Sequence, residues 1–161
     1  AFGTGIHETT RLCAMALQEE LKSKKPTSLL DVGTGTGILA ILGLKLGIPR
    51  AVATDIDPLA LEAANENAEK NGVAPQLTLR NTRPSATGER HPLVIANILA
   101  QPLIDMARDL ADAVATGGLL FLSGILKTQE ESVKDAYVRA GFQFRKTTSL
   151  GEWIRIDLTK N

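Results

Sequence analysis

Three glycines at alternate positions, Gly33, Gly35 and Gly37, lie between two apolar segments of this 161-residue chain. The apolar run 29–32 has the length of a buried strand, and the apolar residues after position 37 have helical spacing. Glycine adopts backbone conformations closed to residues with a Cβ, and it lets a ligand approach bare amides at the first turn of a helix. The pattern predicts a loop that binds a nucleotide cofactor, although glycine-rich turns also connect strands to helices where no ligand binds.

The spacing of the glycines narrows the class of cofactor. Dinucleotide-binding turns place their third glycine where this chain has Ile38, whereas Gly-x-Gly-x-Gly is typical of S-adenosylmethionine-dependent methyltransferases. Asp55 ends the next apolar run, about twenty residues downstream, where an acid can accept hydrogen bonds from ribose hydroxyls. Asp57 and Pro58 then provide an N-cap and a first-turn proline for a helix. A strand that ends in an acid before a capped helix places Asp55 at the carboxyl edge of a parallel sheet.

Composition limits the classes of protein to which the chain can belong. It carries 18 basic and 18 acidic side chains and is 43% hydrophobic, which suits one compact domain over residues 1–161. The balanced charge argues against strong nucleic-acid binding, which needs a basic face. The single cysteine, Cys13, cannot form an internal disulfide, and the apolar runs are too short to span a bilayer. We therefore expect a cytoplasmic protein that has no membrane contact and needs no metal.

Strand and helix patterns alternate along the chain and end with two consecutive strands around residues 150–151. This order predicts an α/β fold with a mostly parallel seven-stranded sheet and a C-terminal antiparallel hairpin, the Rossmann-like arrangement of class I methyltransferases. The predicted helices cover residues 8–22, 38 to about 47, 59–70, 102–114 and 128–139, and the predicted strands cover 28–32, 51–54, 76–80, 93–96, 119–122, 142–147 and 153–158. The polar segment 81–92 is predicted to be a loop with at most a short helix.

Six motifs in collinear order resemble the ribosomal protein L-eleven methyltransferase family. They are FGTGIHETT (2–10), DVGTGTGILAI (31–41), DIDP (55–58), ANILA (96–100), SGIL (123–126) and GEW (151–153). The glycine loop alone indicates only the superfamily, whereas the first motif together with ANILA and SGIL is much more specific. Members carry an N-terminal domain that recognises the substrate, so the resemblance implies that residues 1–161 are the catalytic domain alone.

The resemblance implies S-adenosylmethionine-dependent methylation of amino groups, lysine side chains in particular, on that ribosomal protein. It places the cofactor contacts in four of the motifs, at Thr10, at Gly33, Thr34, Gly35 and Gly37, at Asp55 and Ile56, and at Asn97. Asn97 also has a catalytic role by resemblance, because its side-chain carbonyl would accept a hydrogen bond from the incoming amine. The alternative for Asn97 is a turn residue that satisfies the backbone. For His7, a role at the substrate amine and a hydrogen bond within the preceding loop both remain open.

Two other functions remain open at this stage. The first is a methyltransferase for a different protein lysine or for a nucleic-acid amine. Neutral charge, and the lack of an Asn-Pro-Pro-aromatic motif at Asn97, count against the nucleic-acid version. The second is a cofactor-binding module without activity.

Overall fold

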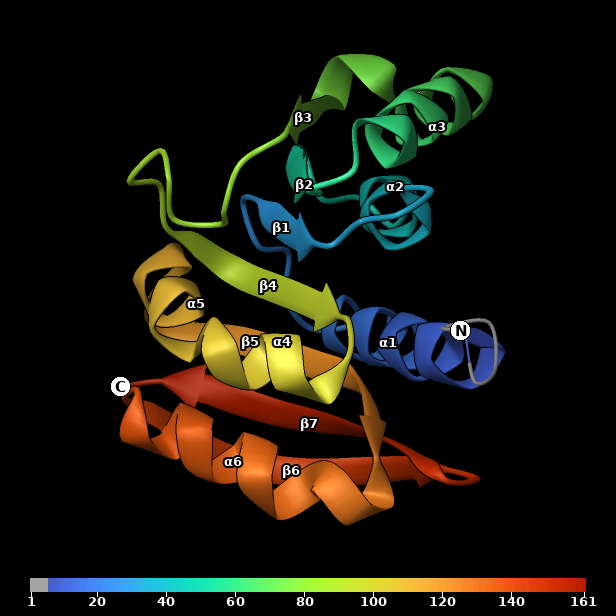
Figure 1. The fold of residues 1–161 in the computed structure, drawn as a ribbon. Helices are drawn as coiled ribbons and strands as arrows, with labels where there is room; N and C mark the ends of the chain where they lie inside the picture. The colour runs from blue at the N-terminus through green and yellow to red at the C-terminus, as the bar shows by residue number, and fades with distance from the viewer. Residues whose placement is uncertain (1–5) are drawn as a thin grey trace.

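The computed structural model, which describes residues 6–161, folds around one seven-stranded sheet with the order β3-β2-β1-β4-β5-β7-β6 (Figure 1). The helices are α1 (Ile6–Glu20), α2 (Ile38–Lys45), α3 (Pro58–Lys70), α4 (Ala100–Asp105), α5 (Ala107–Ala113) and α6 (Glu130–Arg139), with short 3₁₀ helices η1 (Ala74–Gln76) and η2 (Lys127–Gln129). The strands are β1 (Leu29–Val32), β2 (Ala51–Thr54), β3 (Leu77–Arg80), β4 (His91–Asn97), β5 (Val114–Leu126), β6 (Phe142–Leu150) and β7 (Trp153–Lys160). The predicted fold class is confirmed.

Strands β1 to β5 are parallel to one another, and β7 lies between β5 and β6 and runs antiparallel to both. The chain moves outward from β1 through β2 to β3 and then returns to place β4 on the other side of β1. The order of the strands therefore reverses between β1 and β4. In open α/β sheets, ligands bind at such a reversal, outside the carboxyl ends of the strands.

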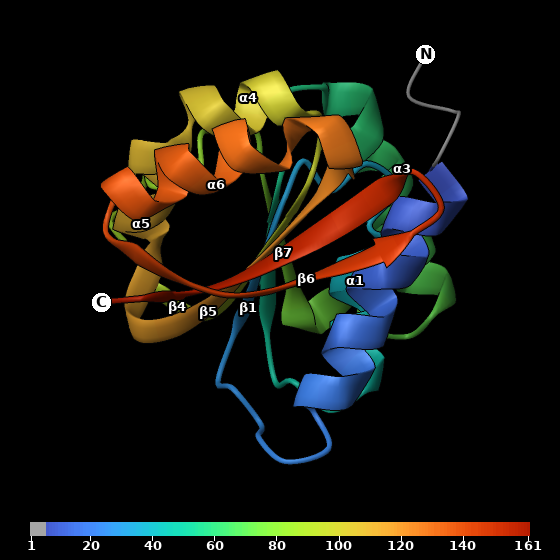
Figure 2. The ribbon, with the colours of Figure 1, turned by 90° about the horizontal axis from the view of Figure 1, so that it is seen from below.

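Helices cover both faces of the sheet (Figure 2). Residues that alternate along a strand point to opposite faces, so β1 contributes Leu30 and Val32 to one apolar core and Leu29 to the other. The first core lies under α4, α5 and α6, and it contains Tyr137, whose hydroxyl donates to the Leu103 carbonyl at 2.7 Å. The second core lies under α1 and α2.

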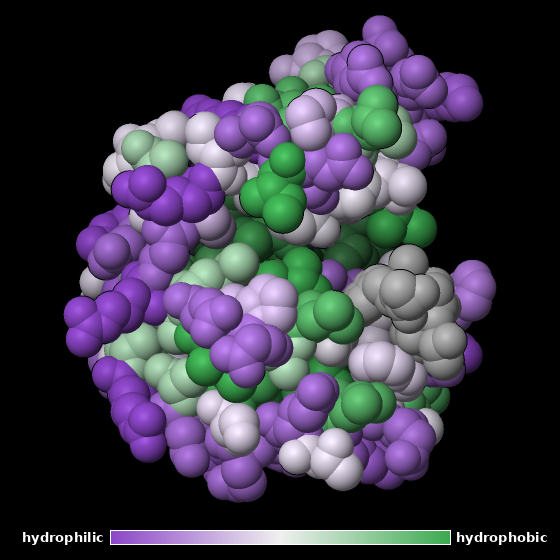
Figure 3. Space-filling view, viewed as in Figure 1, coloured by the Kyte–Doolittle hydropathy of each residue, from purple (hydrophilic) through white to green (hydrophobic). Residues whose placement is uncertain are grey.

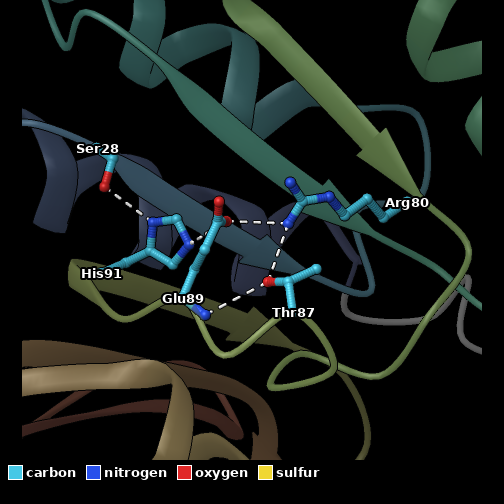
Figure 4. A network of polar contacts seen from close by, with 5 residues as sticks. All are labelled: Ser28, Arg80, Thr87, Glu89 and His91. Carbon is cyan, nitrogen blue, oxygen red and sulfur yellow. Dashed lines mark hydrogen bonds and ion pairs between the residues drawn. The ribbon is translucent and has the colours of Figure 1, made fainter.

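The segment 81–90 connects β3 to β4 without a helix and is held by a polar network (Figure 4). The Arg80 guanidinium donates to Glu89 at 2.9 Å and to the Thr87 hydroxyl at 3.2 Å. This arginine lowers the pKa of Glu89. His91 is 2% exposed, its Nδ1 lies 2.8 Å from the Ser28 hydroxyl, and burial lowers its pKa. The loop expected here is confirmed, but β4 begins at His91, two residues before the predicted strand.

One predicted helix is wrong in its extent. Residues 102–114 were expected to form a single helix, whereas the chain turns at Met106 and separates α4 from α5. The strand β5 then begins at Val114, which is paired with His91. Gly117 and Gly118, expected to follow the end of the helix, lie inside this strand. A Cβ on Gly118 would be 2.7 Å from the Ala115 carbonyl oxygen, so Gly118 permits a close backbone approach, whereas Gly117 has φ +78.

Candidate active site

The register of neighbouring strands brings the predicted site residues into one row at the carboxyl edge of the sheet. The last residue of β1 is paired with the last residue of β2 and with Ala96 of β4. The next residues are Gly33, Asp55 and Asn97, which we call the site row. Because adjacent strands lie about 4.8 Å apart, Asp55 and Asn97 are separated by two strand spacings, roughly 10 Å.

Gly33, Gly35 and Gly37 all have positive φ, but the space around them differs. Gly35 has φ +59, and no atom lies within 4 Å of the position that its Cβ would take. Its side of the loop therefore faces open space. Gly37, with φ +83, precedes α2, and a Cβ there would lie 3.0 Å from the Cβ of Ala64. That glycine lets α2 pack closely against α3.

The carboxylate of Asp55 holds the glycine loop as well as facing the edge of the sheet. Its Oδ2 accepts from the Gly35 amide at 2.9 Å, and its Oδ1 accepts from the Asp57 amide at 3.0 Å. The Gly35 amide, expected to lie against a ligand, thus donates to Asp55 in this structure. Each carboxylate oxygen can accept a second hydrogen bond, so both oxygens retain capacity for hydroxyl donors.

Thr34 turns its side chain into the protein. The Thr34 hydroxyl donates to Oδ2 of Asp31 at 2.7 Å, and both residues are buried. Burial, and to a smaller extent the nearby negative charge of Asp55, raise the pKa of Asp31 to about 7 against the opposing hydrogen bonds from Thr34 and the Ala40 backbone. Only the backbone of Thr34 therefore remains available to a ligand.

Asn97 carries an unusual polar atom. Its Oδ1 is buried, and it has no hydrogen-bond partner within residues 6–161. Leaving a buried acceptor unpaired costs about 1–3 kcal/mol. This oxygen lies at the reversal of the strand order, in the same row as Gly33 and Asp55. A ligand bound there could donate a hydrogen bond to it.

The chain matches the family described as ribosomal protein L11 methyltransferase over residues 1–161. It belongs to that family. A relative from Geobacter metallireducens, named ribosomal protein L11 methyltransferase, is 49% identical over 154 residues, which are 95% of this chain and 50% of the relative. The chain thus spans about half the length of this relative.

Two solved structures support the assignment of the fold. The ribosomal protein L11 methylase from Lactobacillus delbrueckii subsp. bulgaricus has a TM-score of 0.88 and 35% identity, and the match covers 98% of this chain and 81% of that one. The magnesium protoporphyrin IX methyltransferase of Synechocystis with bound SAM has a TM-score of 0.78, 18% identity, and coverage of 98% and 81%. The second likeness supports the fold alone. The site row of this member of the L11 methyltransferase family therefore lies in a class I methyltransferase fold.

Thr10 and His7, the remaining predicted site residues, lie on α1 of this family member. Thr10, expected to contact the cofactor, lies inside the helix and is half-buried. His7 is exposed, and no hydrogen bond or ion pair joins it to the site row within residues 6–161. Residues 2–5, which precede both residues in the family motif, lie outside the described residues. The roles of Thr10 and His7 therefore stay predictions.

A buried ion pair fixes α1 against the C-terminal hairpin. Arg155 donates from Nε to Asp157 at 2.7 Å and from Nη1 to the Leu12 carbonyl at 2.6 Å, and its side chain is 5% exposed. Because Leu12 lies on α1 close to Thr10, this contact determines where the amino-terminal half of the helix sits beside the sheet.

Apolar side chains surround the carboxyl edge. Four exposed large hydrophobic residues directly follow strands or begin the next helices, namely Ile38 (55% exposed), Ile56 (91%), Leu59 (71%) and Leu99 (49%). Figure 3 shows apolar surface in a recess between the part of the molecule with α3 and the part with α4. Exposed apolar residues around a recess suit a ligand or partner with an apolar surface. Ile56, predicted to contact the cofactor, is the most exposed of the four.

Two surface hollows lie elsewhere. One, of about 430 Å³, lies at the opposite edge of the sheet beside Lys25 and Gly118, and the other, of about 670 Å³, lies between α1 and the hairpin beside Met15 and Lys146. No group of three or more potential metal ligands occurs among residues 6–161, and no helix in that range is both long and apolar enough to cross a membrane.

Sequence reasoning missed two residues next to the site row, Ile98 and Gly124. The Ile98 amide donates to the Ser123 carbonyl at 3.1 Å, and Gly124 has φ +87 at an irregularity in the pairing of β5 with β7. The sequence contains a signal for Gly124, because a glycine inside an apolar strand indicates a bulge or a close backbone approach. The SGIL motif entered the sequence analysis only through family resemblance.

Proposed function

We propose that residues 1–161 form the catalytic domain of an S-adenosylmethionine-dependent methyltransferase that modifies amino groups of lysine side chains on ribosomal protein L11. The observation that carries the proposal is the unpartnered Oδ1 of Asn97 in one row with Asp55 and Gly33. Membership of the L11 methyltransferase family supports the reaction and the substrate. A ribosomal protein as substrate would place the enzyme in the cytoplasm.

The site row fits a cofactor in which a ribose is joined to a cationic sulfonium centre. We assign the ribose hydroxyls to the Asp55 carboxylate, which keeps acceptor capacity beyond its two backbone donors. The open side of Gly35 leaves the backbone free for close approach. Ile56 supplies apolar contact, and Thr10 supplies a hydroxyl from α1. Bound there, S-adenosylmethionine supplies an electrophilic methyl group on a sulfonium.

Asn97 would act on the amine. A lysine amine has a pKa near ~10.4 and is mostly charged at neutral pH, whereas the nucleophile must be neutral with a free lone pair. Burial disfavours the ammonium and can lower that pKa by several units. The Asn97 carbonyl would then accept an N–H bond and aim the lone pair at the methyl group. Alignment of the two reactants can contribute on the order of 7–11 kcal/mol, so the residues need to orient the amine more than to remove a proton.

The two ends of the proposed site differ in electrostatic character. Asp55 is half-buried and faces the edge of the sheet, whereas Asn97 is neutral and its oxygen is buried. A neutral acceptor orients an amine without holding it as an ammonium, while a carboxylate at the same point would stabilise the charged form. Asparagine at position 97 is therefore compatible with a neutral nucleophile.

The test is methyl transfer to purified L11. The chain is incubated with S-adenosylmethionine and L11, the mass of the intact L11 is measured, and peptide mapping locates the modified residues. The Geobacter metallireducens relative serves as a positive control. We expect methyl groups on lysine side chains. Unmodified L11 after incubation with this chain, under conditions in which the relative methylates it fully, would contradict the proposal.

Calorimetry tests the cofactor separately. We expect S-adenosylmethionine or its demethylated product to bind, and nicotinamide dinucleotides not to bind, because Ile38 occupies the position of their third glycine. Binding of a nicotinamide dinucleotide alone would overturn the assignment of the cofactor.

A further inference from the structure

Gly124 of β5 makes an unusually close approach to the segment that follows Asn97. Its φ is +87, and a Cβ built on it would lie 2.7 Å from the carbonyl carbon and 3.1 Å from the backbone nitrogen of Ile98, with the Ile98 carbonyl oxygen nearer still. These neighbours are backbone atoms, which cannot rotate away as the end of a flexible side chain can. The position therefore tolerates only glycine unless residue 98 moves.

Residue 98 is also held from its other side. The strand order places it between β1 and β5, and a Cβ on Gly33 would lie 2.5 Å from Cγ2 of Ile98. The Ile98 amide donates to the Ser123 carbonyl at 3.1 Å. The side chain of Ile98 thus abuts the glycine loop while its peptide group abuts β5. Two glycines, one in the loop after β1 and one in β5 on the other side of β4, leave the space that this one residue fills.

We propose that Gly124 is a positioning residue for methyl transfer, because it fixes the peptide of Ile98 and thereby sets where the preceding Asn97 presents its amide oxygen. This inference rests on the proposed function. Asn97 is the last residue of β4 and is paired with Ser123, so its position depends directly on the path of β5 at residues 123–124. Gly124 itself touches neither reactant.

The fixed position matters because Asn97 works by orientation. Its Oδ1 makes no hydrogen bond within the described residues that could hold the side chain in place. The backbone must therefore define where the oxygen lies. A displacement of about 1 Å in a group that orients a reactant can reduce the rate about 100-fold. The cofactor contact proposed on Asp55 follows β2, on the other side of β1 from residue 98, so this displacement should change it little.

The test compares Gly124→Ala with Gly117→Ala, using the rate of methyl transfer to L11 in a single turnover and the affinity for S-adenosylmethionine. Gly117 lies on the same strand with φ +78, but no atom lies within 4 Å of its Cβ position. Both variants therefore carry similar backbone strain, and only one displaces residue 98. We expect Gly124→Ala to lose about 100-fold in rate while its cofactor affinity changes less than about threefold, and Gly117→Ala to keep both.

A second pair of variants covers the case in which Gly124→Ala fails to fold. Ile98→Ala removes the methyl group that abuts Gly33 and leaves residue 98 free to shift, so it should lower the rate with unchanged cofactor affinity. Ile98→Val keeps Cγ2 and should recover most of that rate. Equal losses in rate and cofactor affinity in these variants would mean a merely structural role and would overturn the proposal.

The nuclear magnetic resonance signals of the Asn97 side-chain amide separate this inference from the proposed function. Their chemical shifts should change in Gly124→Ala or in Ile98→Ala, and should be unchanged in Gly117→Ala. If the wild-type chain transfers no methyl group to L11, the proposed function fails, and these signals still decide whether Gly124 positions Asn97. Unmoved Asn97 signals in the variants at positions 124 and 98 would refute the inference whatever the activity.

Discussion

Replacing Asp31 by asparagine should change how the stability of the fold depends on pH. The Asp31 carboxyl is 2% exposed, and its burial raises its pKa from 3.8 to about 7. The native state therefore holds this proton more tightly than the unfolded chain does. The resulting stabilisation is fully present below pH 3.8 and is lost as the pH rises through about 7. The difference between the two pKa values corresponds to on the order of 4 kcal/mol.

Urea denaturation of the wild type and of Asp31→Asn at several pH values measures this effect. Other titrating groups act equally on both proteins, so the difference between their unfolding free energies isolates residue 31. We expect the wild type to lose on the order of 4 kcal/mol relative to the variant between pH 4 and pH 8. Thr34→Val removes the hydroxyl that favours the Asp31 carboxylate, so it should extend the loss to higher pH. A difference between wild type and Asp31→Asn that stays constant over this range would refute the reasoning.

Three further changes have defined outcomes. Asp55→Ala should weaken S-adenosylmethionine binding by about 1.5–3 kcal/mol in calorimetry, because it removes a charged acceptor, and an unchanged affinity in the folded variant would exclude Asp55 from the site. Arg155→Met leaves the Asp157 carboxylate unpaired in the core and should lower the free energy of unfolding by about 3–5 kcal/mol; a loss below about 1 kcal/mol would mean that the pair behaves as an exposed one. Gly37→Ala places a Cβ on a residue with φ +83, 3.0 Å from the Cβ of Ala64, so it should lower the free energy of unfolding by about 1–3 kcal/mol in the same assay. Adding Ala64→Gly should restore part of that loss, and no recovery in the double variant would mean that this contact is unimportant.

Local signals in the sequence were sufficient for the elements that carry the site. The strand 51–54 and its acid were predicted with correct ends, and the N-cap at Asp57 accepts from the Leu59 amide at 2.9 Å. These features depend on residues close in sequence, through turn chemistry and capping. The row formed by Gly33, Asp55 and Asn97 could also be anticipated, because parallel strands bring their carboxyl ends to one edge.

The elements that were mispredicted depend on contacts between distant segments. Gly117 and Gly118 are typical of a turn after a helix, yet they lie in β5, where Gly117 has a positive φ and Gly118 closely approaches the backbone of residue 115. The early start of β4 at His91 depends on the pairing of this residue with Val114, 23 positions later. No pattern within a short window contains such pairings.

Some contacts within the site could not be predicted from the sequence either. The sequence could not reveal that the Gly35 amide donates to Asp55, or that the Thr34 hydroxyl turns inward to Asp31. Nor could it show that Ile98 is enclosed by one glycine from the loop after β1 and another from β5. The contacts of Gly35 with Asp55 and of Ile98 with these glycines depend on strand register, which brings together residues 20 to 65 positions apart.

The most direct test of the proposed mechanism is the effect of Asn97→Ala on two quantities measured in parallel, the single-turnover rate of methyl transfer to L11 and the affinity for S-adenosylmethionine. Thermal melts confirm that the variant folds, and Asn97→Asp, which keeps an acceptor but adds charge, serves as a companion. If the Asn97 carbonyl orients the amine, the rate should fall at least about 100-fold while cofactor affinity changes less than about threefold. An intact rate, or a loss of cofactor binding that accounts for the whole effect, would contradict the assignment of Asn97 to the amine.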